Sequence, residues 1–232
     1  MDFTIDFSAI LKIVGIDIML GVDNAVVIAL ACASLPPALR SRAVIYGTAG
    51  AVVLRAVLLV FASYLMDLTA VKLVAGAYLL WIGYKLLSEN DDEHEVASSQ
   101  HIWGAVKTII VADFMMSLDN VLAVAGAAQS AGAHSNVYAI AGIVLSIPII
   151  VFGAQGIMKM MDRFPVIIWV GAGLLGWVGA EMIISDPLLA DYMARVHHVT
   201  GDWTHLSYKV VGFAAVVFAV LAARHMPKRQ AA

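Results

Sequence analysis

Two segments of the chain carry the same acidic pattern. In each, an aspartate is followed by five apolar or small residues and then by an Asp-Asn pair, and the two copies are offset by 96 positions throughout. Carboxylate and amide oxygens suit hard divalent cations such as Mn²⁺, Mg²⁺ or Ca²⁺. We therefore expect all six residues to be metal ligands. They are Asp17, Asp23 and Asn24 in the first copy and Asp113, Asp119 and Asn120 in the second.

Helical spacing places most of each motif on one face. Asp17, Gly21 and Asn24 are separated by four and three residues, so they share a stripe of a helix. Asp113, Ser117 and Asn120 do the same in the second copy, and the remaining aspartate of each copy lies on the adjoining edge. The small residue in the middle of each stripe lets two helices approach closely. The pattern predicts one pocket that gathers four carboxylates and two amides.

Charge in such a pocket needs an explanation, because each aspartate at the centre of a membrane helix costs about 2.5 to 3.5 kcal/mol. Crowded carboxylates cannot all ionise without a compensating cation. A transported metal would supply that charge. The alternative is a polar network that clamps two helices, with Arg55 as counter-ion. Arg55 could also replace the metal in an emptied site, and Glu181 could either line an exit path or be solvated at the membrane surface.

The composition indicates that lipid surrounds these motifs. Of 232 residues, 62% are hydrophobic and only 13% are charged, against about 25% charged in a soluble domain. The mean hydropathy is +0.89. The net charge of −3 gives no reason to expect a nucleic-acid partner, and a single cysteine excludes a disulfide within the chain. The sequence has no P-loop Gly-Lys-Ser/Thr, so ATP is not expected to be the direct energy source.

Seven apolar stretches approach the roughly 20 residues that a membrane helix needs. The expected fold is therefore all-α, a single transmembrane domain over 1–232 with seven spans as a 3+3 inverted repeat plus one extra helix. The unit of three is odd, so its second copy enters the membrane from the opposite side, and transporters of this design bind their substrate at the repeat interface. The predicted spans are 8–33, 41–65, 70–87, 103–129, 136–160, 165–184 and 206–224. Repeat A covers about 8–87, an acidic cytoplasmic loop 88–101, repeat B 103–184 and the seventh helix 206–224.

Lysine and arginine positions predict the orientation. With the N-terminus outside, nine of these residues fall on the cytoplasmic side and four on the outer side, as the positive-inside rule requires. We expect a multi-pass protein of the bacterial inner membrane with its N-terminus outside and its C-terminus in the cytoplasm.

The duplicated motif resembles that of the TerC family of integral membrane proteins, in particular its short, single-domain YjbE-like branch. The residues that carry the resemblance are Gly21-Val22-Asp23-Asn24-Ala25 and Ser117-Leu118-Asp119-Asn120-Val121, each preceded by its first aspartate. The resemblance implies export of Mn²⁺, within a wider superfamily of cation and amino-acid exporters. No enzyme activity and no bound cofactor are expected. Since lifting a divalent cation against a negative-inside potential costs about 4.6 kcal/mol per 100 mV, we expect protons to be the second partner.

Other functions remain open. The cargo could be Ca²⁺ or a basic amino acid, and the protein could instead assist membrane assembly without transporting anything. An intramembrane aspartyl protease also places aspartates on two helices, but the residues before Asp23 and Asp119 do not form the Gly-x-Gly-Asp pattern of such enzymes. The sequence does not set the oligomeric state.

Overall fold

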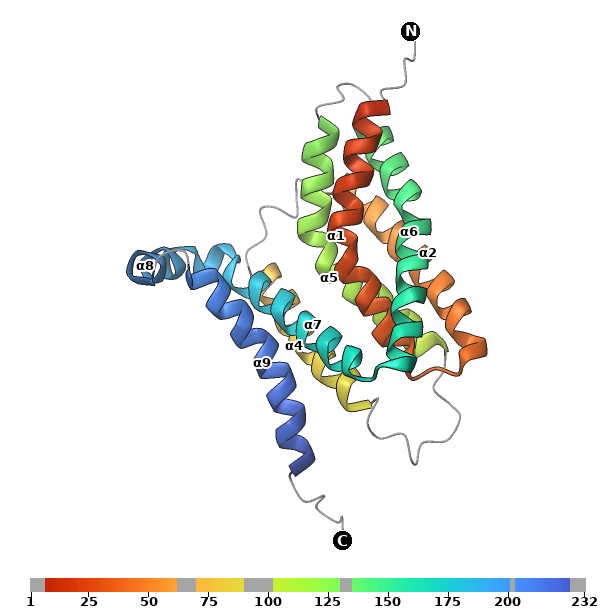
Figure 1. Ribbon diagram of the computed structural model, residues 1–232. Helices are drawn as coiled ribbons and strands as arrows, with labels where there is room; N and C mark the ends of the chain where they lie inside the picture. The colour runs from red at the N-terminus through yellow and green to blue at the C-terminus, as the bar shows by residue number, and fades with distance from the viewer. Residues whose placement is uncertain (1–6, 62–69, 90–101, 130–134, 201–202, 226–232) are drawn as a thin grey trace. The chain divides into compact units, whose positions relative to one another are not determined.

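The computed structural model describes residues 7–61, 70–89, 102–129, 135–200 and 203–225, and these ranges are helical almost throughout (Figure 1). The acidic loop lies almost entirely outside them, at 90–101. The α-helices are α1 (Phe7–Ala33), α2 (Pro37–Val60), α4 (Val71–Glu89), α5 (Ile102–Gln129), α6 (Ser135–Arg163), α7 (Val166–Ile184), α8 (Ala190–Thr200) and α9 (Trp203–His225), and η2 (Pro187–Leu189) is a 3₁₀ turn.

Several of these helices are long and apolar enough to cross a membrane. Five meet this condition within the described residues: Pro37–Leu59, Val71–Ser88, Ile140–Arg163, Val166–Ile184 and Trp203–Arg224. The two parts of α1, Ile10–Met19 and Gly21–Ala33, meet at a bend of 47° and make a sixth if they form one span. The all-α, multi-span prediction is confirmed, whereas the number of seven spans and the inverted repeat stay predictions.

Large apolar side chains cover much of the outer surface of these helices. Leu11 and Phe152 are each 71% exposed, and Phe218 is 65% exposed. Exposed apolar area on this scale would aggregate in water, so it indicates contact with lipid.

Prolines and one arginine set the joint between α1 and α2. Pro37 opens α2, where its missing N–H removes no hydrogen bond, and the predicted end of the first helix before Pro36 is confirmed. Arg40 then satisfies two carbonyls at this joint. Its Nη2 donates to Ala33 O, the last residue of α1, at 2.8 Å, and its Nε donates to Leu35 O in the connection at 2.9 Å. Its Nη1 forms an ion pair with Asp162 at 2.8 Å.

The chain divides into two compact units, 1–68 with 100–162 and 69–99 with 163–232. The first unit contains α1, α2, α5 and α6, and the second contains α4, α7, α8 and α9. Each unit therefore draws on both predicted repeats: the first takes the opening two helices of each repeat, and the second takes the third.

Glycines bring the helices of the first unit close together. A Cβ atom at Gly47 in α2 would lie 2.6 Å from Ile109 Cδ1 in α5. At Gly142 in α6 it would collide with Ile13 in α1. The helix pairs α2–α5 and α6–α1 thus approach through a glycine on one side and an isoleucine on the other.

In the second unit α7 packs against both α4 and α9. Backbone meets backbone at two places, since a Cβ on Gly76 would strike the carbonyl oxygen of Gly179 and one on Gly176 would strike that of Gly212. Side chains of Leu87, Ala172, Val216 and Val220 form the buried cluster beside these contacts.

Asp186 caps two helices of the second unit. Its carboxylate accepts hydrogen bonds from Leu188 N at 2.9 Å in η2, and from Ala70 N at 3.3 Å and Leu73 N at 3.0 Å at the start of α4. Burial acts to raise the pKa of Asp186, but these backbone donors hold it below its ordinary value. Asp186 supplies the cap at the start of α4 because Ala70, the residue before this helix, has no polar side chain. Ala70 itself has a positive φ of 68°.

Candidate metal site

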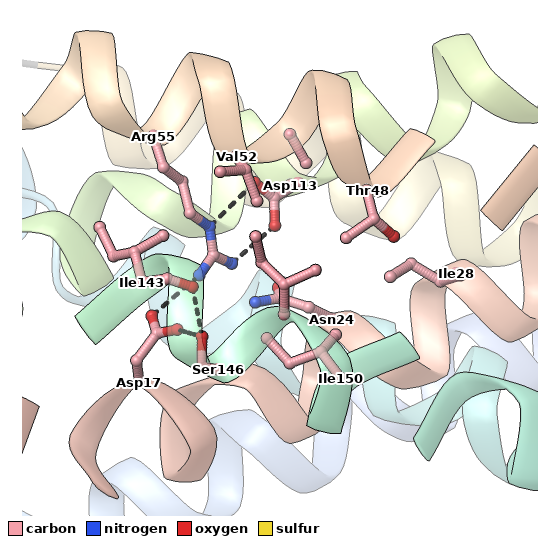
Figure 2. Close-up of a pocket in the computed structure, with 12 residues that line it drawn as sticks. Asp17, Asn24, Ile28, Thr48, Val52, Arg55, Asp113, Ile143, Ser146 and Ile150 are labelled. Carbon is pink, nitrogen blue, oxygen red and sulfur yellow. Dashed lines mark hydrogen bonds and ion pairs between the residues drawn. The ribbon is translucent and has the colours of Figure 1, made fainter. Parts of the chain in front are cut away.

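A pocket lies inside the first unit, between α1, α2, α5 and α6 (Figure 2). It has room for about one water-sized occupant. Its walls combine a few polar groups with aliphatic side chains. The lining residues are Asp17, Asn24, Ile28, Thr48, Ala51, Val52, Arg55, Asp113, Ile143, Ser146, Ile147 and Ile150.

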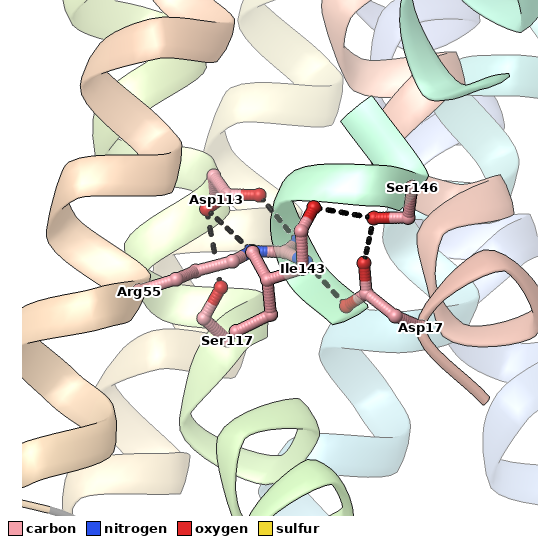
Figure 3. A network of polar contacts seen from close by, with 6 residues as sticks. All are labelled: Asp17, Arg55, Asp113, Ser117, Ile143 and Ser146. Atoms are coloured by element: carbon pink, nitrogen blue, oxygen red, sulfur yellow. Dashed lines mark hydrogen bonds and ion pairs between the residues drawn. The ribbon is translucent and has the colours of Figure 1, made fainter. Parts of the chain in front are cut away.

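Arg55 of α2 bridges the first aspartate of each motif (Figure 3). Its Nη2 and Nε donate to Asp113 Oδ1 at 2.6 Å and Oδ2 at 3.0 Å, and its Nη1 donates to Asp17 Oδ1 at 3.0 Å. All three side chains are buried, with Arg55 only 4% exposed. The helical motifs on α1 and α5 therefore converge on one guanidinium.

Two serines complete the polar contacts of the carboxylates. Ser146 of α6 lies in hydrogen-bonding contact with Asp17 Oδ2 and also with Ile143 O at 2.8 Å. Ser117 of α5 donates to Asp113 Oδ2 at 3.1 Å. Every carboxylate oxygen of the pair thus has a partner, and three of the four are held by Arg55.

Two other polar side chains of the pocket have no partner. Both the Nδ2 and the Oδ1 of Asn24 lack a hydrogen bond, and so does the Oγ1 of Thr48. Asn24 is 2% exposed and Thr48 is 5% exposed, and no dashed line reaches either in Figure 2. Unpaired groups buried this deeply are rare in folded proteins. Their oxygens are available to a ligand.

The bend in α1 separates the two motif residues that reach the pocket. Asp17 lies before the break of 47° and Asn24 lies after it. No proline occurs there, and α1 is helical on both sides of the bend.

The lining positions of α2 and α6 correspond pairwise. Each residue of α2 in the pocket has a counterpart in α6 exactly 95 positions later. Close to this offset, Asp17 and Asp113 are 96 positions apart. The four pairs are Thr48 and Ile143, Ala51 and Ser146, Val52 and Ile147, and Arg55 and Ile150.

The structure brings together three of the six predicted ligands: Asp17, Asn24 and Asp113 all line the pocket. Asp23 is exposed on α1 and is not among the lining residues. Asn120 is half-buried and also lies outside the lining, and the side chain of Asp119 falls outside the described residues. Within the described part of the chain, no group of three or more His, Cys, Asp or Glu side chains is placed to hold a metal. The ligand set stays a prediction.

The sequence reasoning did not find Thr48 and Ser146, which contribute hydroxyls to the pocket from α2 and α6. The 95-residue offset does not mark them, because it pairs Thr48 with Ile143 and Ser146 with Ala51. Arg55 was considered as a counter-ion, and it does contact both aspartates. Glu181 lies in the second unit, where it is exposed and pairs with Lys209 of α9 at 2.5 Å.

The arrangement can bind a cation through oxygen atoms. The pocket offers two carboxylates, one amide, and the hydroxyls of Thr48 and Ser146, and Ser117 stands behind Asp113. The set contains no thiolate or imidazole, so it suits hard divalent ions. A divalent ion binding both carboxylates would compete with Arg55 for Asp113, because Arg55 holds both oxygens of that carboxylate.

Helices of this length and composition, an apolar outer surface and a buried cluster of charged side chains between the helices define an integral, multi-pass membrane protein. The chain belongs to the family described as "Integral membrane protein TerC family", which it matches over residues 3–231. The prediction of that family is therefore confirmed.

Three similar proteins come from bacteria. The chain is 44% identical to the "Uncharacterized membrane protein YjbE" of Bacillus subtilis (strain 168), covering 81% of this chain and 84% of that one. It is 25% identical to "Uncharacterized membrane protein YkoY" of the same organism, over 89% of this chain and 69% of the relative. It is 26% identical to "UPF0053 inner membrane protein YgdQ" of Escherichia coli (strain K12), over 74% and 78%. No solved structure matches the chain.

Proposed function

We propose that the protein is an exporter of divalent metal cations, with Mn²⁺ as the favoured cargo, that binds its substrate in the Asp17–Asp113 pocket. The observation that carries the proposal is the combination of two buried carboxylates with an unpaired amide on Asn24 and an unpaired hydroxyl on Thr48. A site built only to clamp helices would have its polar groups paired with one another. Here two oxygens are left over, and both belong to the chemical class that hard cations select.

The size and lining of the pocket favour a bare ion. There is space for about one water-sized occupant, and the lining residues include no aromatic side chain that would hold an organic cation. A basic amino acid would need a larger cavity. A guanidinium between the two carboxylates also argues against an aspartyl protease, in which two carboxylates share one proton.

The paired lining positions support the inverted repeat as part of the mechanism. If α1–α2 and α5–α6 are related by a pseudo-two-fold axis, the pocket lies on that axis, which is where inverted-repeat transporters bind their cargo. A site on the axis can open to either side by equivalent movements. In an inner membrane, which the name of YgdQ states for that relative, a movement that opens the loaded site to the outside exports the cargo, and the driving gradient sets this direction.

Proton exchange supplies the energy in this proposal. Removing a divalent ion from a negative-inside cell costs about 4.6 kcal/mol per 100 mV, and protons that enter in exchange return positive charge. Carboxylates serve both roles, because they bind metal when ionised and can hold a proton when the metal has left.

The test measures the manganese content of cells that lack their own exporter. We expect the wild-type chain to lower it, and Asp17→Asn and Asp113→Asn to fail although present in the membrane. Asp191→Asn is the matched control, because Asp191 is an exposed carboxylate on α8 outside the pocket. Asp23→Asn and Asp119→Asn decide whether these two motif residues belong to the transport site.

Two results would contradict the proposal. If the wild type leaves the content of manganese and of other divalent metals unchanged, the protein is not an exporter of these ions. If Asp17→Asn and Asp113→Asn protect as well as the wild type, the buried aspartates are structural.

A further inference from the structure

Resting on this proposed function, we propose that Arg55 is a tethered cation that takes the place of the cargo in the empty site. Metal binding displaces its guanidinium from Asp17 and Asp113, and the return of the guanidinium closes the emptied pocket. Arg55 is then the residue that allows the carrier to reset without metal.

The contacts of Arg55 lead to this inference. Its three donors hold Asp113 Oδ1, Asp113 Oδ2 and Asp17 Oδ1, at 2.6, 3.0 and 3.0 Å. Both oxygens of Asp113 are held in this way, so a metal that used both carboxylates would compete with Arg55 for at least one oxygen. An arginine side chain stays protonated. Its guanidinium therefore has to move away from the carboxylates when the metal binds.

The two carboxylates of the pocket are paired, but two of its neutral side chains are not. Asn24 and Thr48 have no hydrogen-bond partner while Arg55 is seated. Arg55 therefore pairs with the two carboxylates and leaves Asn24 and Thr48 unpaired. This is expected of a stand-in that matches the charge of the cargo but has donors in place of a cation's coordination sphere.

Comparison with the paired position in α6 separates charge from packing. The counterpart of Arg55 is Ile150, which packs over Gly21, where a Cβ would lie 3.0 Å from Ile150 Cδ1. Ser117, the counterpart of Gly21, instead donates to the same Asp113 oxygen as Arg55. The position in α6 that corresponds to Arg55 is thus filled by the aliphatic side chain of Ile150. Filling space alone would not require a buried arginine on the other side.

The physical need for a stand-in arises when the metal leaves. Two ionised carboxylates facing each other in a low-dielectric pocket repel strongly. This unneutralised charge would oppose the conformational change of the empty carrier. With Arg55 seated, one of the two negative charges is neutralised within the protein. Part of the positive charge lost with the metal is therefore replaced without any solute.

The experiment compares two kinds of flux in proteoliposomes loaded with radioactive Mn²⁺. Exchange against external unlabelled Mn²⁺ requires only the loaded carrier to cross. Net efflux into chelator-containing buffer also requires the empty carrier to return. We expect Arg55→Gln to retain exchange but to lose net efflux by tenfold or more, and Arg55→Lys, which keeps the charge, to recover much of the net efflux.

Binding of Mn²⁺ to the purified protein gives a second readout, which does not depend on transport. Removal of the competing cation should tighten Mn²⁺ binding by Arg55→Gln at least severalfold over the wild type. Arg55→Lys should bind with an affinity between the two. A merely structural arginine predicts weaker binding or none after its removal.

The outcomes distinguish this inference from the proposed function. If the wild type shows neither exchange nor net efflux, the proposed function fails. If the wild type shows both and Arg55→Gln keeps net efflux at the wild-type rate, the empty carrier returns without Arg55 and the inference is overturned. It is also overturned if Arg55→Gln binds Mn²⁺ more weakly than the wild type.

Discussion

Replacing Asn24 with leucine should make the protein more stable and its metal binding weaker. Leucine has nearly the same branched shape as asparagine, so it should fill the same space. Because neither amide atom of Asn24 has a hydrogen-bond partner, the wild type carries the cost of burying it, about 1–3 kcal/mol. Asn24→Leu should recover a similar free energy of unfolding, or several degrees in the melting midpoint.

The loss of an oxygen ligand has the opposite effect on function. Mn²⁺ affinity should fall at least about tenfold, as it does when ligands or their supporting groups are removed from metal sites. Thr48→Val should behave alike, because the Thr48 hydroxyl is also unpaired. Ser146→Ala is the contrasting control, since this hydroxyl contacts Asp17 and Ile143 O, and its removal should destabilise the protein.

The assay is thermal unfolding of the purified protein in detergent, followed by intrinsic tryptophan fluorescence with and without Mn²⁺. In the wild type, added Mn²⁺ should raise the midpoint, because a ligand that binds only the folded state stabilises it. Asn24→Leu should start higher and rise less. A midpoint more than a few degrees below that of the wild type would show that the amide has a partner in the folded protein, and an unchanged response to Mn²⁺ would show that it is no ligand.

Three further predictions concern the second unit. Gly76→Ala should separate α4 from α7, since its methyl would meet the carbonyl oxygen of Gly179, and should cost about 1–3 kcal/mol in thermal unfolding; Gly156→Ala, with nothing within 4 Å of the new methyl, is the control and should be neutral or stabilising. Asp186→Asn should destabilise the protein at neutral pH. Because the pKa of Asp186 is lowered in the folded state, the stabilisation by the carboxylate is complete above its ordinary pKa of about 4, and the difference from the wild type should shrink as the pH falls below about 4 and vanish below the lowered pKa. Ala70→Gly should raise the melting midpoint by relieving the positive φ of 68°, a gain of about 0.5–1 kcal/mol, and an unchanged or lower midpoint would contradict this reading.

Much of the helical architecture followed from the apolar stretches. The predicted spans 8–33 and 165–184 differ by one residue at most from α1 and α7 at each end. The second span was expected from 41, whereas α2 begins at Pro37, because Arg40 interrupts the apolar stretch just before that position although proline favours a helix start. The division into units was not foreseen, since it depends on which helix faces pack and not on hydropathy.

The candidate site was predictable in part for a similar reason. The duplicated motif identified Asp17, Asn24 and Asp113 because helical spacing places residues of one helix on a common stripe. Spacing does not say which stripe faces a neighbouring helix, so Asp23 was expected in a pocket whose lining does not include it. Thr48 and Ser146 carry no unusual sequence signal by themselves, and only the packing of α2 and α6 against the motif helices brings them to the pocket.

The most direct test of the central claim is the binding of Mn²⁺ to the purified chain, measured by equilibrium dialysis or electron paramagnetic resonance, with Asp17→Asn and Asp113→Asn compared to the wild type. The pocket predicts saturable binding of about one ion per chain to the wild type, given its size, and its loss in both variants while Asp191→Asn binds normally. Saturable binding that survives in both pocket variants, or none in the wild type, would contradict the assignment of this pocket as the metal site.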